Sequence, residues 1–76
     1  MRVISSDGNM NIPYENHIFG LSENSDDTGN IYVTTYRGNR SIGVYPVEKA
    51  YLVFEEMIAY GNQEMKVYRM PGEEIP

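Results

Sequence analysis

One amphipathic helix, predicted over residues 46–60, limits what this chain can fold into more than any other feature. Apolar side chains recur there in steps of three, one, three and one, a period that places them on one side of a helix. The stripe consists of Ala50, Val53, Phe54, Met57 and Ile58. A helix of roughly four turns cannot bury such a stripe alone, so the rest of the chain has to supply a packing surface.

The predicted helix has clear signals at its two ends. Pro46 suits the first turn, because its missing N–H would have no partner there, and Glu48 favours the positive end of the helix dipole. Gly61 follows the last periodic residue and is expected to end the helix in a left-handed conformation. The start lacks a capping side chain, since Tyr45 offers no short acceptor for the free N–H groups.

The remaining sequence is predicted to form short strands. Apolar and β-branched runs occupy residues 2–5, 10–14, 17–21, 31–36, 41–45 and 65–70. Asp7-Gly8 in the segment Ser6–Asn9 is a hairpin signal between the first two runs. The predicted fold class is therefore α+β, a mainly antiparallel sheet of about five to six short strands with one helix packed on one face, in the order βββββαβ.

The length of 76 residues predicts a single domain over residues 1–76, with a folded part at 1–70 and a flexible tail at 71–76. The polar segment Ser22–Asn30 is predicted to be a mobile loop, and its role is left open. A chain this short buries a modest core, and oligomerisation is a common remedy at this size.

Several chemistries lack the residues that they need. The chain has no cysteine and one histidine, His17, which has no thiol to join it at a metal or in a nucleophile–base pair. Residues 24–30 are spaced like a calcium loop, but Thr35 stands where the closing glutamate belongs. Glu55 and Glu56 are adjacent on the helix, so their carboxylates diverge. We therefore expect no enzyme, no cofactor and no metal.

The charge and hydropathy patterns indicate a compartment and exclude some partners. Six basic and eleven acidic residues give a net charge of −5, which disfavours a surface that tracks phosphates, so nucleic acid is not the expected partner. No apolar run approaches the ~20 residues that span a membrane, and the N-terminus lacks the apolar core of a signal peptide. The sequence predicts a cytoplasmic protein without membrane attachment.

Seven tyrosines and no tryptophan suggest a contact surface. In the run 31–36, aliphatic side chains alternate with tyrosines, and one helix covers only one side of a sheet. The interaction face predicted on the open side consists of Tyr32, Tyr36, Arg37, Arg40, Tyr45 and Tyr68. The alternative is that these are ordinary strand tyrosines on a solvated face.

Two stretches, MRVISSDGNMNIPYE at the start and GVYPVEKAYLVFEEM before and within the helix, resemble a group of short, uncharacterised proteins from prophages and other mobile elements of Firmicutes bacteria. Members of the group open similarly and begin the helix with Y-S/T-x-E-K-A. Tyr45, Glu48, Lys49 and Ala50 match this pattern, whereas Pro46 replaces the capping hydroxyl. The resemblance implies a bacterial or phage setting and carries over no catalytic residue.

These observations lead to one main hypothesis and two alternatives. The main hypothesis is a non-enzymatic protein-interaction module of a phage or mobile element, for example an inhibitor that occludes a host or defence protein. The first alternative is a self-assembling structural protein, such as a homodimer formed through the same face or an edge strand. The second is an oligomer that binds a small ligand or nucleotide, with Arg37 and Arg40 meeting phosphate.

Overall fold

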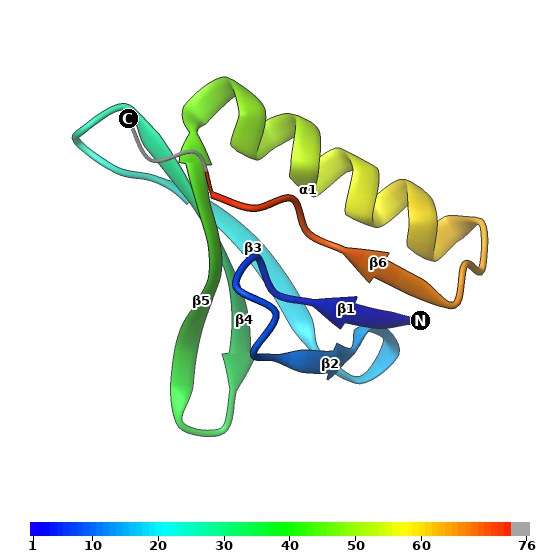
Figure 1. Ribbon diagram of the computed structural model, residues 1–76. Coiled ribbons are helices and arrows are strands. Elements are labelled where there is room, and N and C mark those ends of the chain that lie inside the picture. Colours follow the sequence, from blue (N-terminus) through cyan, green and yellow to red (C-terminus); the bar gives the residue numbers. More distant parts are fainter. Residues whose placement is uncertain (74–76) are drawn as a thin grey trace.

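The computed structural model describes residues 1–73 and contains two three-stranded sheets and one α-helix (Figure 1). The small sheet has the order β2-β1-β6 and consists of β1 (Arg2–Ile4), β2 (Asn11–Pro13) and β6 (Val67–Arg69). The meander sheet has the order β3-β4-β5 and consists of β3 (Ile18–Glu23), β4 (Thr28–Thr35) and β5 (Gly38–Pro46). The 3-10 helix η1 (Tyr14–Asn16) joins β2 to β3, and α1 (Val47–Asn62) joins β5 to β6.

The order of elements along the chain agrees with the predicted βββββαβ, but the prediction of one sheet is wrong. The N-terminal hairpin forms as predicted, and β1 then pairs in parallel with β6 on its other side, with Val3 opposite Tyr68. This pairing joins the two ends of the chain into a separate sheet. Turn signals predict neighbours along the chain, whereas a parallel pair between distant segments has no such local signal.

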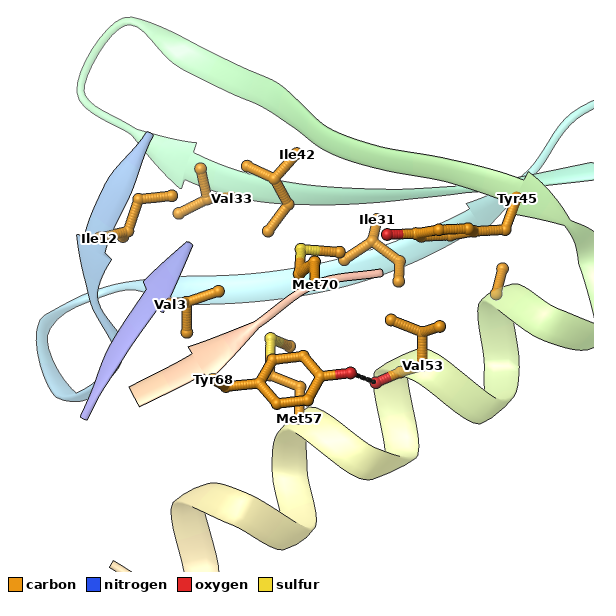
Figure 2. Packing of buried hydrophobic residues seen from close by; sticks show 11 residues of the cluster. Val3, Ile12, Ile31, Val33, Ile42, Tyr45, Val53, Met57, Tyr68 and Met70 are labelled. Atoms are coloured by element: carbon orange, nitrogen blue, oxygen red, sulfur yellow. Dashed lines mark hydrogen bonds between the residues drawn. The ribbon is translucent and has the colours of Figure 1, made fainter. Parts of the chain in front are cut away.

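The core lies between the meander sheet on one side and α1 with the small sheet on the other (Figure 2). Buried side chains from both sheets and from the helix meet there, including Val3, Val33 and Met57. We call the covered side of the meander sheet its inner face. The opposite side, the outer face, carries the alternate residues of the same three strands.

The predicted apolar stripe of α1 is confirmed in its central part. Ala50, Val53 and Met57 are buried, and Phe54 packs against the cluster from the side. The helix approaches β4 closely at Gly29, where a Cβ atom would lie 2.5 Å from the Cβ of Ala50. Glycine is therefore required at this position by packing rather than by a turn.

The two ends of α1 differ in detail from the prediction. The helix starts at Val47 without a side-chain cap, and the Val47 N–H donates instead to the carbonyl oxygen of Asp27 at 3.0 Å. Gly61 lies inside the helix and does not end it; Glu64 takes the left-handed conformation with φ of 56°. Gly61 has a different role, because a Cβ there would lie 2.6 Å from the ring of Tyr14.

A β-bulge at Ile42 changes which side chains of β5 face the core. The register with β4 shifts by one residue at this point. Uninterrupted alternation would send Ile42 and Val44 inward and Tyr45 outward, and the sequence-based interaction face assumes this outward position for Tyr45. The extra residue reverses the alternation beyond Ile42, so Tyr45 enters the core, and the predicted outward position of Tyr45 is wrong.

The predicted loop Ser22–Asn30 is shorter than expected. Strand β3 continues to Glu23 and β4 begins at Thr28, which leaves only residues 24–27 between them. The Asn24 N–H donates to the Thr28 carbonyl oxygen at 2.8 Å, and Asp27 is left-handed with φ of 63°. This is the geometry of a hairpin that a type I turn and one left-handed residue close.

The segment after β6 lies along β5. The Tyr45 hydroxyl donates to the carbonyl oxygen of Pro71 at 2.6 Å, and a carboxylate oxygen of Glu73 accepts the Val44 N–H at 3.0 Å. The flexible tail predicted for residues 71–76 thus includes residues with defined contacts. Its last part, residues 74–76, lies outside the described residues.

Candidate functional site

The structure divides the six predicted interaction residues into two groups. Tyr45 and Tyr68 are 1% and 2% exposed, so the prediction that they project from an open face is wrong for these two (Figure 2). The Tyr68 hydroxyl donates to a carboxylate oxygen of Glu56 at 2.9 Å and lies 3.4 Å from the carbonyl oxygen of Val53. Both tyrosines therefore belong to the core, with their hydroxyl groups satisfied inside the protein.

The electrostatics of these two hydroxyl groups fit a structural role. Burial raises the pKa of Tyr45 to about 12, and the negative charge of Glu73 acts in the same direction. Burial also raises the pKa of Tyr68, and the hydrogen bond to Glu56 favours the protonated hydroxyl further. Neither phenol is poised to act as an acid or base near neutral pH.

The other four predicted residues are accessible. Tyr32 is half-buried on the outer face, where its ring covers Gly20; a Cβ on Gly20 would lie 2.4 Å from that ring. Tyr36 is 93% exposed at the β4–β5 turn, and the Arg37 guanidinium lies 5.4 Å from its ring centroid. Arg40 is exposed on the same hairpin. The turn residues therefore form one group, and Tyr32 lies roughly 13 Å further along β4.

The outer face has an unusual composition for a chain with this many charged residues. Its strand positions, deduced from register and alternation, are Ile18, Gly20, Ser22, Thr28, Asn30, Tyr32, Thr34, Asn39, Ser41, Val44 and Pro46. No charged side chain is among them. Neighbouring polar groups pair across the strands: the Ser41 hydroxyl donates to Asn30, and the Thr34 hydroxyl donates to Asn39 at 2.8 Å.

Charges of opposite sign lie at the two ends of the outer face. Arg37 is in the β4–β5 turn, and Asp26 and Asp27 are in the β3–β4 turn. Arg40 lies in β5 opposite Val33, which places it on the inner side of the sheet. Figure 1 shows these turns at opposite ends of the meander sheet. The hydrogen bond from the Thr28 hydroxyl holds the pKa of Asp26 below its usual value, so this carboxylate stays charged near neutral pH.

A second surface was not predicted from the sequence. A groove of about 530 Å³ separates η1 and the start of β3 from the C-terminal half of α1. Its lining consists of Tyr14, Glu15, His17, Phe19, Phe54, Met57, Ile58 and Gly61. The Tyr14 and Phe19 rings stack with centroids 5.5 Å apart, and Nδ1 of His17 lies 2.9 Å from the carbonyl oxygen of Pro13. No sequence pattern connects residues 14–19 with residues 54–61, which is why the groove was missed.

Comparisons with known proteins add no family assignment. The chain matches no protein-family model, no curated protein and no solved structure at a significant level. Within residues 1–73, no group of three His, Asp or Glu side chains is placed to hold a metal ion. In the same range, no helix has the length and apolar character needed to cross a membrane.

Proposed function

We propose that this protein is a non-enzymatic interaction module that binds a protein partner through the outer face of the meander sheet. The observation that supports this proposal is the absence of charged residues from an exposed sheet face in a chain of net charge −5. The centres of protein–protein interfaces are depleted of charged residues and enriched in tyrosine. Tyrosine surrounded by Ser, Asn and Gly is also the composition of antibody contact loops.

The arrangement of the outer face suits a binding role. The Tyr32 ring lies over Gly20 and offers a partner a large contact area, and a tyrosine side chain has only two rotatable bonds to fix on binding. Ile18, on the neighbouring strand, is 72% exposed and adds apolar area. A partner that docks here would have part of its own surface covered, which is how a small protein can inhibit by occlusion. An origin in a phage or mobile element, suggested by the sequence resemblance, is part of this proposal.

The test compares an outer-face variant with a matched helix variant. The double variant Ile18→Ser/Tyr32→Ser removes one aliphatic and one aromatic side chain from the outer face. The control, Tyr51→Ser/Leu52→Ser, removes the same pair of residue types from exposed positions on α1. Each chain is immobilised and exposed to a bacterial lysate, and the retained proteins are quantified by mass spectrometry, with circular dichroism as a check of folding.

We expect the outer-face variant to lose specifically retained proteins that the wild type and the helix control keep. The proposal is wrong if a folded outer-face variant retains the same proteins as the wild type. It is also wrong if the helix control loses them to the same extent, because the contact would then not depend on this face.

A second candidate function, self-association, is favoured by the charges at the two ends of the outer face. Two copies that stack these faces with their strands reversed would place the Arg37 end of one against the Asp27 end of the other. Three strands about 4.8 Å apart offer less than the roughly 800 Å² per partner of a standard interface, so such a dimer would be weak. Arg37→Gln and Asp27→Asn should each shift sedimentation towards the monomer, whereas Glu55→Gln should not.

A further inference from the structure

The two outer edges of the meander sheet differ in whether other segments cover them. At the β5 edge, the Ile42 carbonyl oxygen accepts the Ser6 N–H at 2.9 Å, and the Val44 N–H donates to Glu73 at 3.0 Å. At the β3 edge, no segment among residues 1–73 makes a corresponding backbone hydrogen bond. Strand β3 also lacks the proline, lysine or bulge by which proteins commonly protect an exposed edge. The β3 edge is therefore open to an additional strand.

The outward-facing backbone groups of β3 follow from its register. The Asn24 N–H bonds to the Thr28 carbonyl oxygen, so this pair is a hydrogen-bonded one. Hydrogen-bonded and non-hydrogen-bonded pairs alternate in an antiparallel ladder. The residues of β3 that bond to β4 are then Ser22, Gly20 and Ile18. The residues whose N–H and C=O groups point to the open edge are Phe19, Leu21 and Glu23.

The same alternate residues carry side chains on the side of the groove. Phe19 lines the groove, and Leu21 follows two positions along the same face. Residues of an added strand that lie opposite Phe19 and Leu21 would project their side chains to this side as well. One extended segment could thus pair with the β3 backbone and fill the groove at the same time.

The composition of the groove selects for particular side chains. Phe19, Phe54 and Ile58 form apolar walls, and the volume of about 530 Å³ falls within the roughly 300–1,000 Å³ of typical ligand pockets. No lysine or arginine belongs to the lining. Two carboxylates flank β3: Glu15 in η1 forms an ion pair with the Met1 amino group, and Glu23 accepts a hydrogen bond from the Tyr51 hydroxyl at 3.1 Å. An occupant with apolar side chains at its centre and basic side chains at its ends fits this pattern.

We propose that the groove between β3 and α1 binds an extended peptide segment of a partner protein, which adds to the open edge of β3 as a fourth strand. The segment places two apolar side chains, two residues apart, into the groove and carries Lys or Arg on either side. Main-chain pairing supplies affinity in this mode of recognition, and the pockets for alternate side chains supply specificity. This proposal uses other residues than the outer face and does not depend on the function proposed for that face.

The test begins with a selection on the full-length chain. A phage library of random ten-residue peptides is enriched on the immobilised protein, and the most enriched peptide is synthesised with a fluorescein label. We expect enriched sequences to have apolar residues two positions apart with Lys or Arg on either side. The absence of enrichment over an unrelated immobilised protein, or enrichment of acidic sequences, would overturn the proposal.

Two positions on α1 provide a matched pair of variants for fluorescence anisotropy with the labelled peptide. Ile58→Lys places a positive charge on the groove wall, and Leu52→Lys makes the same kind of change at an exposed position outside the groove lining. We expect Ile58→Lys to weaken binding at least about 10-fold and Leu52→Lys to change it less than about 2-fold. Tyr32→Ser should leave this affinity unchanged. Equal effects of the two lysine variants would contradict a site in the groove.

Amide hydrogen exchange on the wild-type chain tests strand addition without any substitution. Saturation with the peptide should slow exchange of the Phe19 and Leu21 amides, which face the open edge. The Gly20 and Ser22 amides, which already bond to β4, should change little. A bound peptide that protects neither Phe19 nor Leu21 would rule out strand addition. Protection of these two amides that rises with protein concentration alone would also overturn the proposal, because the edge would then pair with a second copy of the chain.

Discussion

The inner and outer faces of the meander sheet are made by alternate residues of the same three strands, yet their environments differ completely. On the inner face, Ile31 and Val33 have no exposed surface, because α1 and the small sheet cover them. On the outer face, Thr34 is exposed and Tyr32 half-exposed, and no segment among residues 1–73 packs over them. The comparison shows that similar strand residues become core or contact surface according to which side the helix covers.

The tyrosines make the same comparison within one residue type. Tyr45 and Tyr68 lie in the core with hydroxyl groups bonded inside the protein, whereas Tyr32 and Tyr36 lie on accessible surface. A buried ring stabilises the fold because its apolar area is removed from water on folding. An exposed ring stays in water after folding, and its apolar area can be removed from water only when a partner binds. Substitutions at the two sets should therefore affect different properties: stability in the first set and binding in the second.

The largest difference is expected between Tyr68→Ala and Tyr32→Ala. Tyr68 packs edge-on against Tyr60 at a centroid distance of 4.9 Å and is almost fully buried, so its truncation should cost about 3–5 kcal/mol of unfolding free energy. Tyr32→Ala should cost less than about 1 kcal/mol, because its outer side faces solvent. Urea unfolding measures both values. Equal losses would mean that the outer face is as much a part of the core as the inner face.

Gly29 on the inner face and Gly20 on the outer face allow the two faces to be compared by adding one methyl group to each. In Gly29→Ala the new Cβ meets Ala50 on the packed helix, which cannot move aside, and we expect a loss of about 1–3 kcal/mol. In Gly20→Ala the new Cβ meets the Tyr32 ring, which can turn away from an open face, so the loss should be under about 1 kcal/mol. Thermal unfolding of both variants checks the order. A more destabilising Gly20→Ala would show that the Tyr32 ring is rigidly held.

A smaller effect should appear at alkaline pH. Because burial raises the pKa of Tyr45 to about 12, the folded protein binds its phenolic proton more tightly than the unfolded chain, in which tyrosine has its ordinary pKa of 10.0. The stability from this group is complete below pH 10 and is lost as the pH rises towards 12. Urea unfolding from pH 9 to 11.5 should follow this loss. Tyr45→Phe should show a weaker dependence on pH; an unchanged dependence would assign the effect to other groups.

The smallest effect on stability is expected for Tyr36→Ser. Tyr36 is almost fully exposed at the β4–β5 turn, and its ring contact is with the exposed Arg37. The unfolding free energy should remain within about 0.5 kcal/mol of the wild-type value in urea titrations. A loss of unfolding free energy above about 1 kcal/mol would mean that Tyr36 stabilises the fold, and it would then not differ from the buried tyrosines as expected.

The features that the sequence determined are those with local causes. The helix followed from the 3.6-residue period of its apolar stripe, and α1 spans Val47–Asn62 against the predicted 46–60. The N-terminal hairpin followed from Asp7-Gly8, and the burial alternation in β4 followed from the pattern of residues 31–36. The outward orientation of Tyr32 could be predicted for the same reason, because it lies in a strand whose alternation is uninterrupted. Tyr36 is exposed because it lies beyond the end of β4, in the β4–β5 turn.

The tertiary structure alone decided the features that depend on contacts between distant segments. The parallel pairing of β1 with β6 created a second sheet and buried Tyr68. The extra residue at Ile42 directs the Tyr45 side chain towards the core. The groove beside β3 exists because η1 and the end of α1 lie close together. Local sequence sets the period with which side chains alternate along an element. Which side of the element is covered depends on the elements that pack against it, and this packing is determined by the whole chain.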